Sequence, residues 1–261
     1  MTILSKILLS DCSHRIRLGI ARDGGYVICE NDLNDADFLL SFGLSSEWSF
    51  EKDFAMKNPN SPIHVYDYSV SLIFYVEMFV RECVKLLALR SNIGLVFSKF
   101  KVITNYIRFF SYQGLHFKSR IASPVHGNLD VSIADVFSRV PSSRIFLKID
   151  IEGSEYRVLS EISKFEDRIV GLAIEFHEVN FMFEKFCDAL ILLNKHFEII
   201  HVHGNNFSFF NSESKLPDAI ELTFSRRPEH VKKNRPFQVP NGSLDFPNNI
   251  SAEDYRFDFP F

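Results

Sequence analysis

Short apolar runs alternate with amphipathic segments along most of this chain. The apolar runs, which predict buried strands, lie at residues 37–43, 63–67, 144–151, 168–177, 198–202 and 219–226. Segments with the spacing of helices lie between them at 48–56, 154–163 and 183–197. Strands that alternate with helices indicate a parallel sheet with helices on both faces. Strands that are apolar throughout indicate a sheet buried on both sides, so the pattern predicts an α/β fold.

Two regions do not follow this alternation. Residues 69–112, after the second predicted strand, have the apolar spacing of long helices. Residues 69–120 contain eight Lys or Arg and two Glu, a local charge of +6 in a chain whose net charge is −4. The segment from residue 228 is rich in Pro and Asn and carries several aromatic residues. We therefore predict one domain over residues 1–261, with a helical insertion at 69–112 and an irregular tail at 228–261 that its rings hold to the surface.

The composition narrows the class of protein. Hydrophobic residues make up 46% and charged residues 24%, as expected for a globular chain with a sizeable core. The net charge of −4 gives no argument for a nucleic-acid partner, and no apolar stretch reaches the roughly 20 residues of a membrane span. No signal-peptide cleavage pattern follows the short apolar run near the start, and the four cysteines are scattered without a CxxC pair. We expect a cytoplasmic protein with reduced, buried thiols, no transmembrane segment and no nucleic-acid partner.

One glycine and several polar residues stand where the predicted strands end. They are Gly43, Asp67, Asp150, Glu175, His177 and His203. In an open parallel sheet, ligands bind beyond the carboxyl ends of the strands, near the point where the strand order reverses. Burying these groups without partners would cost free energy, which favours a shared functional site at this edge.

The first two strand ends suggest a cofactor site. The candidate binding residues are Gly43, Ser45, Ser46, Glu47 and Asp67. Gly43 would let the backbone approach a ligand, the two serines would bind a carboxylate, and Glu47 would face a positive charge. Asp67 follows 24 residues after Gly43, where an acidic residue can accept hydrogen bonds from both ribose hydroxyls. The alternatives are an ordinary turn with a serine cap and an Asp67 that caps the next segment. A nicotinamide cofactor is disfavoured because no GxGxxG is present.

The later strand ends suggest catalysis. The candidate catalytic residues are His177, His203, Glu175 and Asp150. On a strand, Asp150 and Glu152 would point to the same face, an arrangement that suits metal binding or base chemistry. The alternative has Glu152 capping the next helix and Lys148 neutralising a carboxylate. A histidine is a natural base near neutral pH, although a lone histidine is more often a structural residue.

Several motifs, in order along the chain, resemble the FkbM family of methyltransferases. They are DGGYVI (23–28), SFGLSSEWSFE (41–51), FLKIDIEGSEYRVL (146–159), EFH (175–177), HVHGNN (201–206) and LPDAIELTF (216–224). The third is close to the family's usual K-I-D-x-E-G-x-E. The resemblance implies a class I, Rossmann-like methyltransferase sheet of seven strands, the last one antiparallel. It also implies S-adenosylmethionine as methyl donor, with DGGYVI as a hairpin or as a flap near the cofactor.

The function that this resemblance implies is O-methylation. Known acceptors in the family include sugars and polyketide hydroxyls, so we expect transfer to a hydroxyl of a sugar, a polysaccharide or a related natural product. Some related enzymes hold Mg²⁺ at the ends of the fourth and fifth strands, which are the places of Asp150 and Glu175 here. His177 or His203 would serve as the base.

Other functions stay open at this point. A methyltransferase fold can serve as a non-catalytic glycan- or lipid-binding module, because a fold alone does not prove an activity. A nucleotide-sugar oxidoreductase and a base N-methyltransferase are weaker alternatives, since their glycine and D/N-P-P-Y motifs are absent. The insertion at 69–112 departs from shorter family members. It could be a lid for an anionic acceptor, a structural or dimer contact in a homo-oligomer, or a membrane-surface element.

Overall fold

The computed structural model describes residues 9–12, 14–226, 231–233, 237–240 and 242–259, and its centre is a sheet of nine strands. Seven consecutive strands, counted from the β6 edge, are β6 (Gly114–Phe117), β5 (Ile63–Tyr66), β4 (Phe38–Phe42), β9 (Ile145–Ile149), β10 (Ile169–Phe176), β14 (Ile220–Ser225) and β11 (Glu198–Gly204). The strands are parallel except β14, which is antiparallel to both of its neighbours. Strands β1 (Leu9–Asp11) and β15 (Val231–Lys233) extend the β11 edge. The predicted seven-stranded α/β sheet, with its last strand antiparallel, is therefore present.

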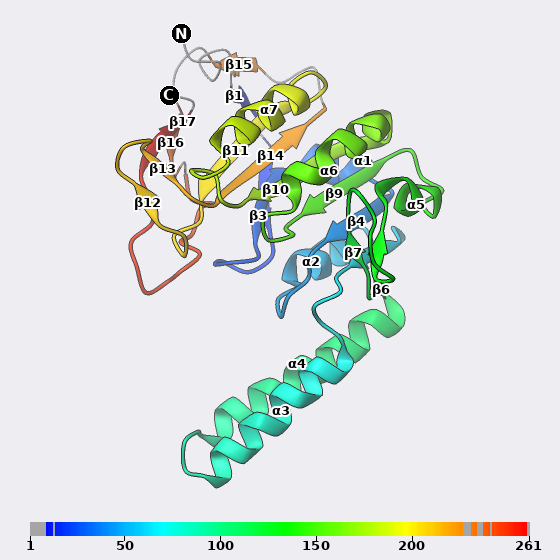
Figure 1. Cartoon of the computed structure of the whole chain (residues 1–261), viewed down its shortest axis with the longest axis vertical. Helices are drawn as coiled ribbons and strands as arrows, with labels where there is room; N and C mark the ends of the chain where they lie inside the picture. The colour runs from blue at the N-terminus through cyan, green and yellow to red at the C-terminus, as the bar shows by residue number, and fades with distance from the viewer. Residues whose placement is uncertain (1–8, 13, 227–230, 234–236, 241, 260–261) are drawn as a thin grey trace.

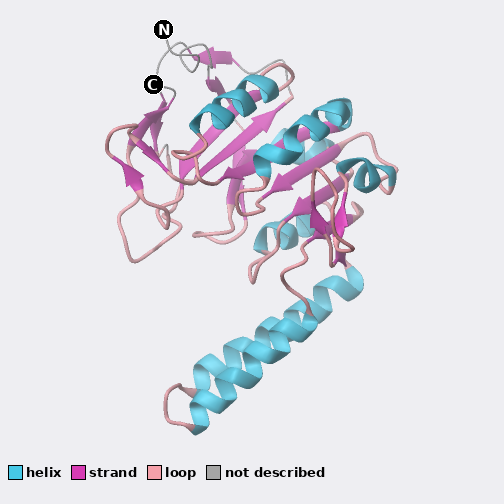
Figure 2. Cartoon of the chain, viewed as in Figure 1, coloured by secondary structure: helices cyan, strands magenta, loops and turns pink. Residues whose placement is uncertain are grey.

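Helices cover both faces of this sheet, as Figure 2 shows. One face packs against α5 (Ile133–Ser138), α6 (Glu155–Ile162) and α7 (Phe183–Leu193), and a short 3₁₀ helix (Ser163–Arg168) follows α6. The other face packs against α1 (Glu30–Asp35), α2 (Ser49–Lys57) and the hairpin of β2 (Arg15–Leu18) and β3 (Tyr26–Cys29). Each face has its own buried cluster because successive strand residues point to opposite sides.

The predicted insertion is a helical hairpin that projects away from the sheet (Figure 1). It consists of α3 (Leu72–Leu87) and α4 (Ile93–Tyr112), and each helix begins after a side-chain cap, Ser71 for α3 and Asn92 for α4. At the base of the hairpin, the Trp48 ring contacts Tyr75 and Tyr106 at centroid distances of 5.7 and 5.9 Å. These aromatic contacts join the hairpin to the loop after β4.

The tail returns to the sheet. Strands β16 (Phe237–Val239) and β17 (Phe257–Phe259) pair with each other. Asp245, Asn248 and Asp254 contact the polar face of the sheet, whereas Tyr255 and Phe257 pack in the apolar cluster of the α5–α7 face. The Tyr255 hydroxyl donates to the Ser208 carbonyl, and Arg17 lies over the Phe246 ring. These aromatic residues hold the described part of the tail to the rest of the domain, and residues 228–230, 234–236, 241 and 260–261 lie outside the described residues. The remaining short strands form the pairs β7 (Arg120–Ile121) with β8 (Asp130–Val131) and β12 (Phe210–Asn211) with β13 (Leu216–Pro217).

Three sequence predictions need correction. The edge strand β6 was not predicted, because Gly-Leu-His-Phe has no apolar run. Helix α7 ends at Leu193 rather than at residue 197, and β11 continues to Gly204. All four cysteines are free, but only Cys12 and Cys29 are buried, whereas Cys83 and Cys187 are half-buried. Among the described residues, no helix has the length and apolar character to cross a membrane.

Candidate functional site

The sheet has an apolar face and a polar face at its carboxyl edge. In β9, Leu147 and Ile149 enter the apolar core, whereas Lys148 points to the other face, where its ammonium lies 3.6 Å from Glu51 and 3.9 Å from Asp150. In the neighbouring strands, Glu175 of β10 is in register with Glu221 of β14, and Glu221 with His203 of β11. A row of ionisable side chains therefore crosses four strands on one face.

Gly43 and Asp67 lie together where β4 and β5 end. Gly43 has φ +88°, and a Cβ there would lie 1.7 Å from the Asp150 carbonyl oxygen, so no other residue fits. One Asp67 oxygen accepts the Leu44 and Ser45 backbone N–H groups at 2.8 and 3.1 Å. The other accepts the Ser69 N–H at 2.7 Å and its hydroxyl at 2.6 Å. Burial alone would raise the Asp67 pKa, but these hydrogen bonds outweigh it and lower the pKa.

A cavity of about 210 Å³ opens between these two strand ends and the end of β9. It is lined by Gly43, Tyr66, Asp67, Tyr68, Ser69, Ser119, Arg120, Ile121, Asp150, Ile151, Glu152 and Ser154. The guanidinium of Arg120 lies 5.5 Å from the centroid of the Tyr68 ring. The predicted residues Gly43 and Asp67 therefore border a cavity with an aromatic ring, hydroxyls and carboxylates.

The predicted residues Asp150, Glu175 and His177 come together beside this cavity. One ligand atom from each lies within 4.8 Å of the others, close enough to hold a single metal ion. The Tyr26 hydroxyl oxygen lies 3.2 Å from Asp150 and 3.4 Å from Glu175, so its one proton can be donated to either carboxylate, and Asn205 donates to Glu175 at 2.7 Å. Burial, and then the charges of neighbouring carboxylates, raise the pKa of Glu175 well above its usual range. A cation at this point would offset that repulsion.

Glu155 holds the His177 ring in position. Its Oε1 accepts the backbone N–H groups of Ile151 and Gly153, both at 3.1 Å, and lies 3.1 Å from His177 Nδ1. The second ring nitrogen, Nε2, lies 3.8 Å from Glu175 and 3.5 Å from Glu152. Burial lowers the His177 pKa, but the Glu155 hydrogen bond and nearby carboxylates outweigh it and raise the pKa to about 10.

Glu152 does not take the place predicted for it. The strand ends at Ile149, and Glu152 has φ +53°, so it does not share a strand face with Asp150. Its side chain is 84% exposed, and it does not cap α6. Glu155, the second Glu of the motif, stabilises this turn instead, a role that the sequence alone did not indicate.

His203 is surrounded by carboxylates. Nδ1 lies 3.3 Å from Glu221, Nε2 lies 3.0 Å from Asp254 of the tail, and the side chain is 1% exposed. Burial lowers its pKa, but Asp254 and Glu221 outweigh it and raise the pKa to about 10. A base role for His203 would require breaking these ion pairs, so its contacts favour a structural role that joins the tail to the sheet.

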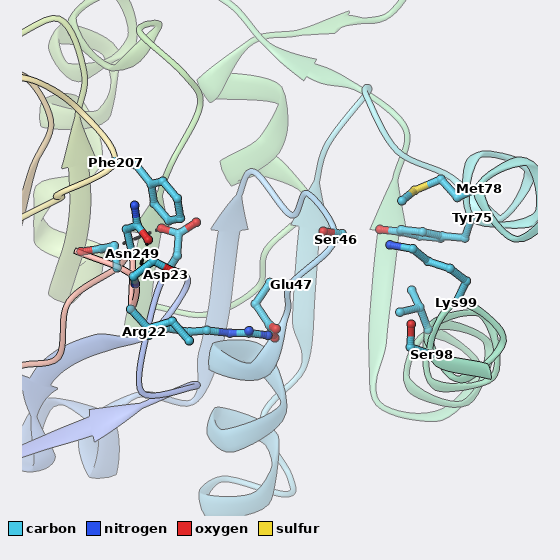
Figure 3. Close-up of a pocket in the computed structure, with 14 residues that line it drawn as sticks. Arg22, Asp23, Ser46, Glu47, Tyr75, Met78, Ser98, Lys99, Phe207 and Asn249 are labelled. Carbon is cyan, nitrogen blue, oxygen red and sulfur yellow. Dashed lines mark hydrogen bonds between the residues drawn. The ribbon is translucent and has the colours of Figure 1, made fainter. Parts of the chain in front are cut away.

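A larger cavity of about 590 Å³ lies between the loop after β4 and the base of the helical hairpin. It is lined by Arg22, Asp23, Ser46, Glu47, Tyr75, Met78, Ser98, Lys99, Val102, Phe207 and residues 248–251. Figure 3 shows Arg22 and Glu47 pointing toward each other, with Tyr75 and Lys99 on the opposite wall. Ser45, with φ +52°, accepts a hydrogen bond at its carbonyl from the Tyr75 hydroxyl. Of the predicted cofactor residues, Gly43 and Asp67 thus line the smaller cavity and Ser46 and Glu47 the larger one, whereas Ser45 lines neither.

Two residues of the site, Asn248 and Asp254, come from the tail, which was not predicted to reach it. Tyr26 and Glu155 lie in the DGGYVI and FLKIDIEGSEYRVL motifs without a predicted role, whereas Lys148 lies beside Asp150, as the alternative interpretation had it. The Asn248 amide donates to Asp23 at 3.1 Å and to Glu221 at 2.7 Å, which joins the tail to the turn of the DGGYVI hairpin and to the sheet. The hairpin lies over the polar face, where the Thr223 hydroxyl donates to the Val27 carbonyl at 2.6 Å.

Part of the chain matches a known protein family. Residues 129–222 match the model of the methyltransferase FkbM domain, which confirms the predicted resemblance over the segment that carries Asp150 and Glu175. The chain is similar to a fibrillarin/Nop5p complex structure, with 11% identity, coverage of 74% of each chain and a TM-score of 0.36. It is also similar to the precorrin-6y C5,15-methyltransferase from Geobacter metallireducens GS-15, with 10% identity, coverage of 80% of this chain and 98% of that chain, and a TM-score of 0.37. No curated protein matches the sequence. The strand order and the domain match confirm the predicted class I methyltransferase fold.

Proposed function

We propose that this chain, whose FkbM domain and class I fold support S-adenosylmethionine-dependent methyl transfer, is an O-methyltransferase. Its acceptor is a hydroxyl of a sugar, a polysaccharide or a related natural product. The observation that carries this proposal is the convergence of Asp150, Glu175 and His177 beside the cavity at Gly43 and Asp67. It supports the proposal because transfer to a weakly nucleophilic hydroxyl needs a base, or a cation that lowers the hydroxyl pKa, next to the cofactor.

The smaller cavity suits one part of the cofactor. Its volume of about 210 Å³ is below the roughly 300 Å³ of a complete small-molecule site, so it fits the adenosine half of S-adenosylmethionine. Tyr68 supplies a ring for stacking on a base, and Asp67 lies at the predicted ribose position. Both Asp67 oxygens already accept two hydrogen bonds, so a ribose hydroxyl would replace the Ser69 hydroxyl on Oδ1. The larger cavity, with Ser46 and Glu47, would then receive the amino-acid end.

His177 is the proposed base. Its Nδ1 is held by Glu155, while Nε2 faces Glu175 on the cavity side. The cofactor supplies an electrophilic methyl group on a sulfonium sulfur. The acceptor oxygen would form the new bond to this methyl carbon as the carbon–sulfur bond breaks with its electron pair left on sulfur, and His177 would remove the hydroxyl proton. Holding these groups in line is itself a large part of such catalysis.

Asp150 and Glu175 are the proposed ligands of a divalent cation, for which we predicted Mg²⁺. Two carboxylates leave the remaining positions to water or to the acceptor oxygen, which fits the preference of Mg²⁺ for oxygen ligands. When bound, the cation would lower the pKa of an acceptor hydroxyl. The cation would also offset the charges of the carboxylates that raise the His177 pKa. His177 would therefore be a neutral base at pH 7 only with the cation bound.

The larger cavity, of about 590 Å³, has room for the acceptor beside the amino-acid end of the cofactor and is the proposed place of both. Its walls carry two acids, two basic residues and several amides and hydroxyls, with few apolar side chains. Such a lining can form many hydrogen bonds with a polyhydroxyl compound. It is less suited to a flat apolar acceptor, which an aromatic slot would bind better.

A labelled-methyl screen tests this function. The protein would be incubated with S-adenosylmethionine labelled in its methyl group and with soluble glycans or polysaccharide fractions. We expect label in a product that resists mild base, as a methyl ether does and a methyl ester does not. Cofactor binding without transfer to any hydroxyl compound would favour the binding-module alternative instead. Label found on nitrogen or on a carboxylate would contradict O-methylation of a sugar hydroxyl.

A further inference from the structure

The outer surface of the α3–α4 hairpin carries an apolar stripe that no described residue covers. On α3, Tyr75 and Glu82 face inward and are buried, and the Phe79 ring contacts Phe100 of α4 at 5.9 Å. The residues of the stripe are Ile73, Val76, Val80, Val84 and Leu87, whose exposed fractions range from 41% to 85%. Their spacing of three or four residues places them on one side of the helix. An amphipathic helix that only packed against its neighbour would be polar there.

The stripe runs into the tip of the hairpin, the part farthest from the sheet in Figure 1. Leu87, Leu89 and Ile93 are 85%, 93% and 71% exposed, and Phe97 follows at 68%. Single exposed apolar residues are normal on soluble proteins, but a continuous patch of them marks an interaction surface. The patch at the tip is separate from both cavities, which open at the base of the hairpin.

The charge of the hairpin favours one class of partner. Residues 69–112 contain six Lys or Arg and two Glu, a net charge of +4. Arg81 pairs with Glu77 and Lys85 with Glu82, so the excess positive charge belongs to the other basic residues, including Arg90 at the tip. A second copy of this hairpin would bring like charges together. A bilayer that contains anionic lipid offers both an apolar layer and a negative surface.

We propose that the tip of the α3–α4 hairpin docks on an anionic lipid bilayer and inserts Leu87, Leu89, Ile93 and Phe97 at the interface. In this kind of docking, the hairpin lies at the surface of the bilayer and does not cross it. Among the described residues, no helix is long and apolar enough to span a membrane. Arg90 lies in the loop that joins α3 to α4 at the apolar tip and would contact lipid phosphates. The inference does not depend on the methyl-transfer reaction.

Vesicle co-sedimentation of the full chain tests this proposal. Vesicles would contain phosphatidylcholine alone, or phosphatidylcholine with phosphatidylglycerol. We expect binding to the anionic vesicles that weakens as salt rises, because exposed charges act within about 8 Å at physiological salt. The triple variant Leu87→Gln/Leu89→Gln/Ile93→Gln should lower the partition coefficient at least about a hundredfold, since each buried apolar side chain contributes roughly a factor of ten.

Two further variants make the result specific. Arg90→Gln should lower the partition coefficient on anionic vesicles about fivefold, since it removes one cation at the tip. The matched control Phe181→Gln replaces an apolar residue that is 83% exposed but lies before α7, and it should bind as the wild type does. Circular dichroism would verify that each variant keeps its helices.

Three results would overturn the proposal. The first is a wild-type chain that binds neither kind of vesicle. The second is a Phe181→Gln control that loses binding as strongly as the triple variant. The third is a wild-type dimer in sedimentation velocity that the triple variant converts to monomer without any vesicle binding, which would make a second copy the partner.

Discussion

The substitution Asp67→Asn separates the two roles that the structure combines in Asp67. The carboxylate accepts four hydrogen bonds, two on each oxygen. An amide keeps one oxygen, which we expect to stay with the Leu44 and Ser45 N–H groups, and turns its NH₂ toward the Ser69 hydroxyl. The Ser69 N–H then loses its acceptor, and the remaining bonds lose the charge. One charge-assisted hydrogen bond contributes about 1.5–3 kcal/mol.

We therefore expect the free energy of unfolding to fall by about 2–4 kcal/mol, measured by urea denaturation. This leaves the variant folded if the wild type has the usual stability of about 5–15 kcal/mol. If Asp67 also binds ribose, calorimetry should show an affinity for S-adenosylmethionine roughly tenfold to a hundredfold lower, from about 1.5–3 kcal/mol. The matched control is Asp53→Asn, whose carboxylate accepts the Gly19 N–H at 2.8 Å. It should lose stability and keep its affinity. An Asp67→Asn protein with lowered stability and unchanged affinity would refute the ribose assignment and leave Asp67 as a brace of the loop.

Three more outcomes follow from the site. Gly43→Ala should lower the free energy of unfolding by at least about 3 kcal/mol, because the new Cβ would meet the Asp150 carbonyl. Gly242→Ala is the control: its φ is +96° but no atom lies within 4 Å of the new Cβ, so it should lose only about 1 kcal/mol. Equal losses in denaturant titrations would count against the close approach at Gly43. Stability from the protonated His203 is full below the unfolded-state pKa of about 6.5 and is lost as pH rises through its folded pKa of about 10. The unfolding free energy should therefore fall between pH 7 and 10, and Asp254→Asn should flatten that fall; an equally steep fall in the variant would show that the pair is not its source. Glu175→Gln should abolish Mg²⁺ binding in calorimetry if Glu175 is a ligand, and binding as tight as in the wild type would exclude that role.

The sheet could be predicted from the sequence because its strands are buried on both faces. The continuous apolar runs at 144–151 and 168–177 indicate buried strands for that reason. They correspond to β9 and β10, whose ends differ from the predicted ones by one or two residues. Topology then brings the strand ends together, so Gly43 and Asp150 meet at one edge. The strand β6 escaped notice because four residues at the sheet edge need little apolar character.

The covering of the site could not be predicted in the same way. The β2–β3 hairpin brings Tyr26 to the site, and the tail brings Asn248 and Asp254. Tertiary packing sets the positions of both segments, and the spacing of residues along the sequence does not reveal that packing. The Glu152 prediction was wrong for a local reason, because strand alternation no longer applies once the chain turns through a positive φ. On sequence alone, His203 was a candidate base at a strand end. Its second carboxylate partner, Asp254, belongs to the tail and could not be identified without the structure.

The rate of labelled-methyl transfer to a hydroxyl acceptor, by the wild type and by His177→Ala, tests the central claim most directly. The readout is single-turnover transfer with S-adenosylmethionine and Mg²⁺ in excess, so that binding does not limit the rate. The account predicts transfer by the wild type and a rate about 10²–10⁴ lower in His177→Ala, with cofactor affinity nearly unchanged. A His177→Ala protein that transfers methyl groups to the hydroxyl at the wild-type rate would contradict it.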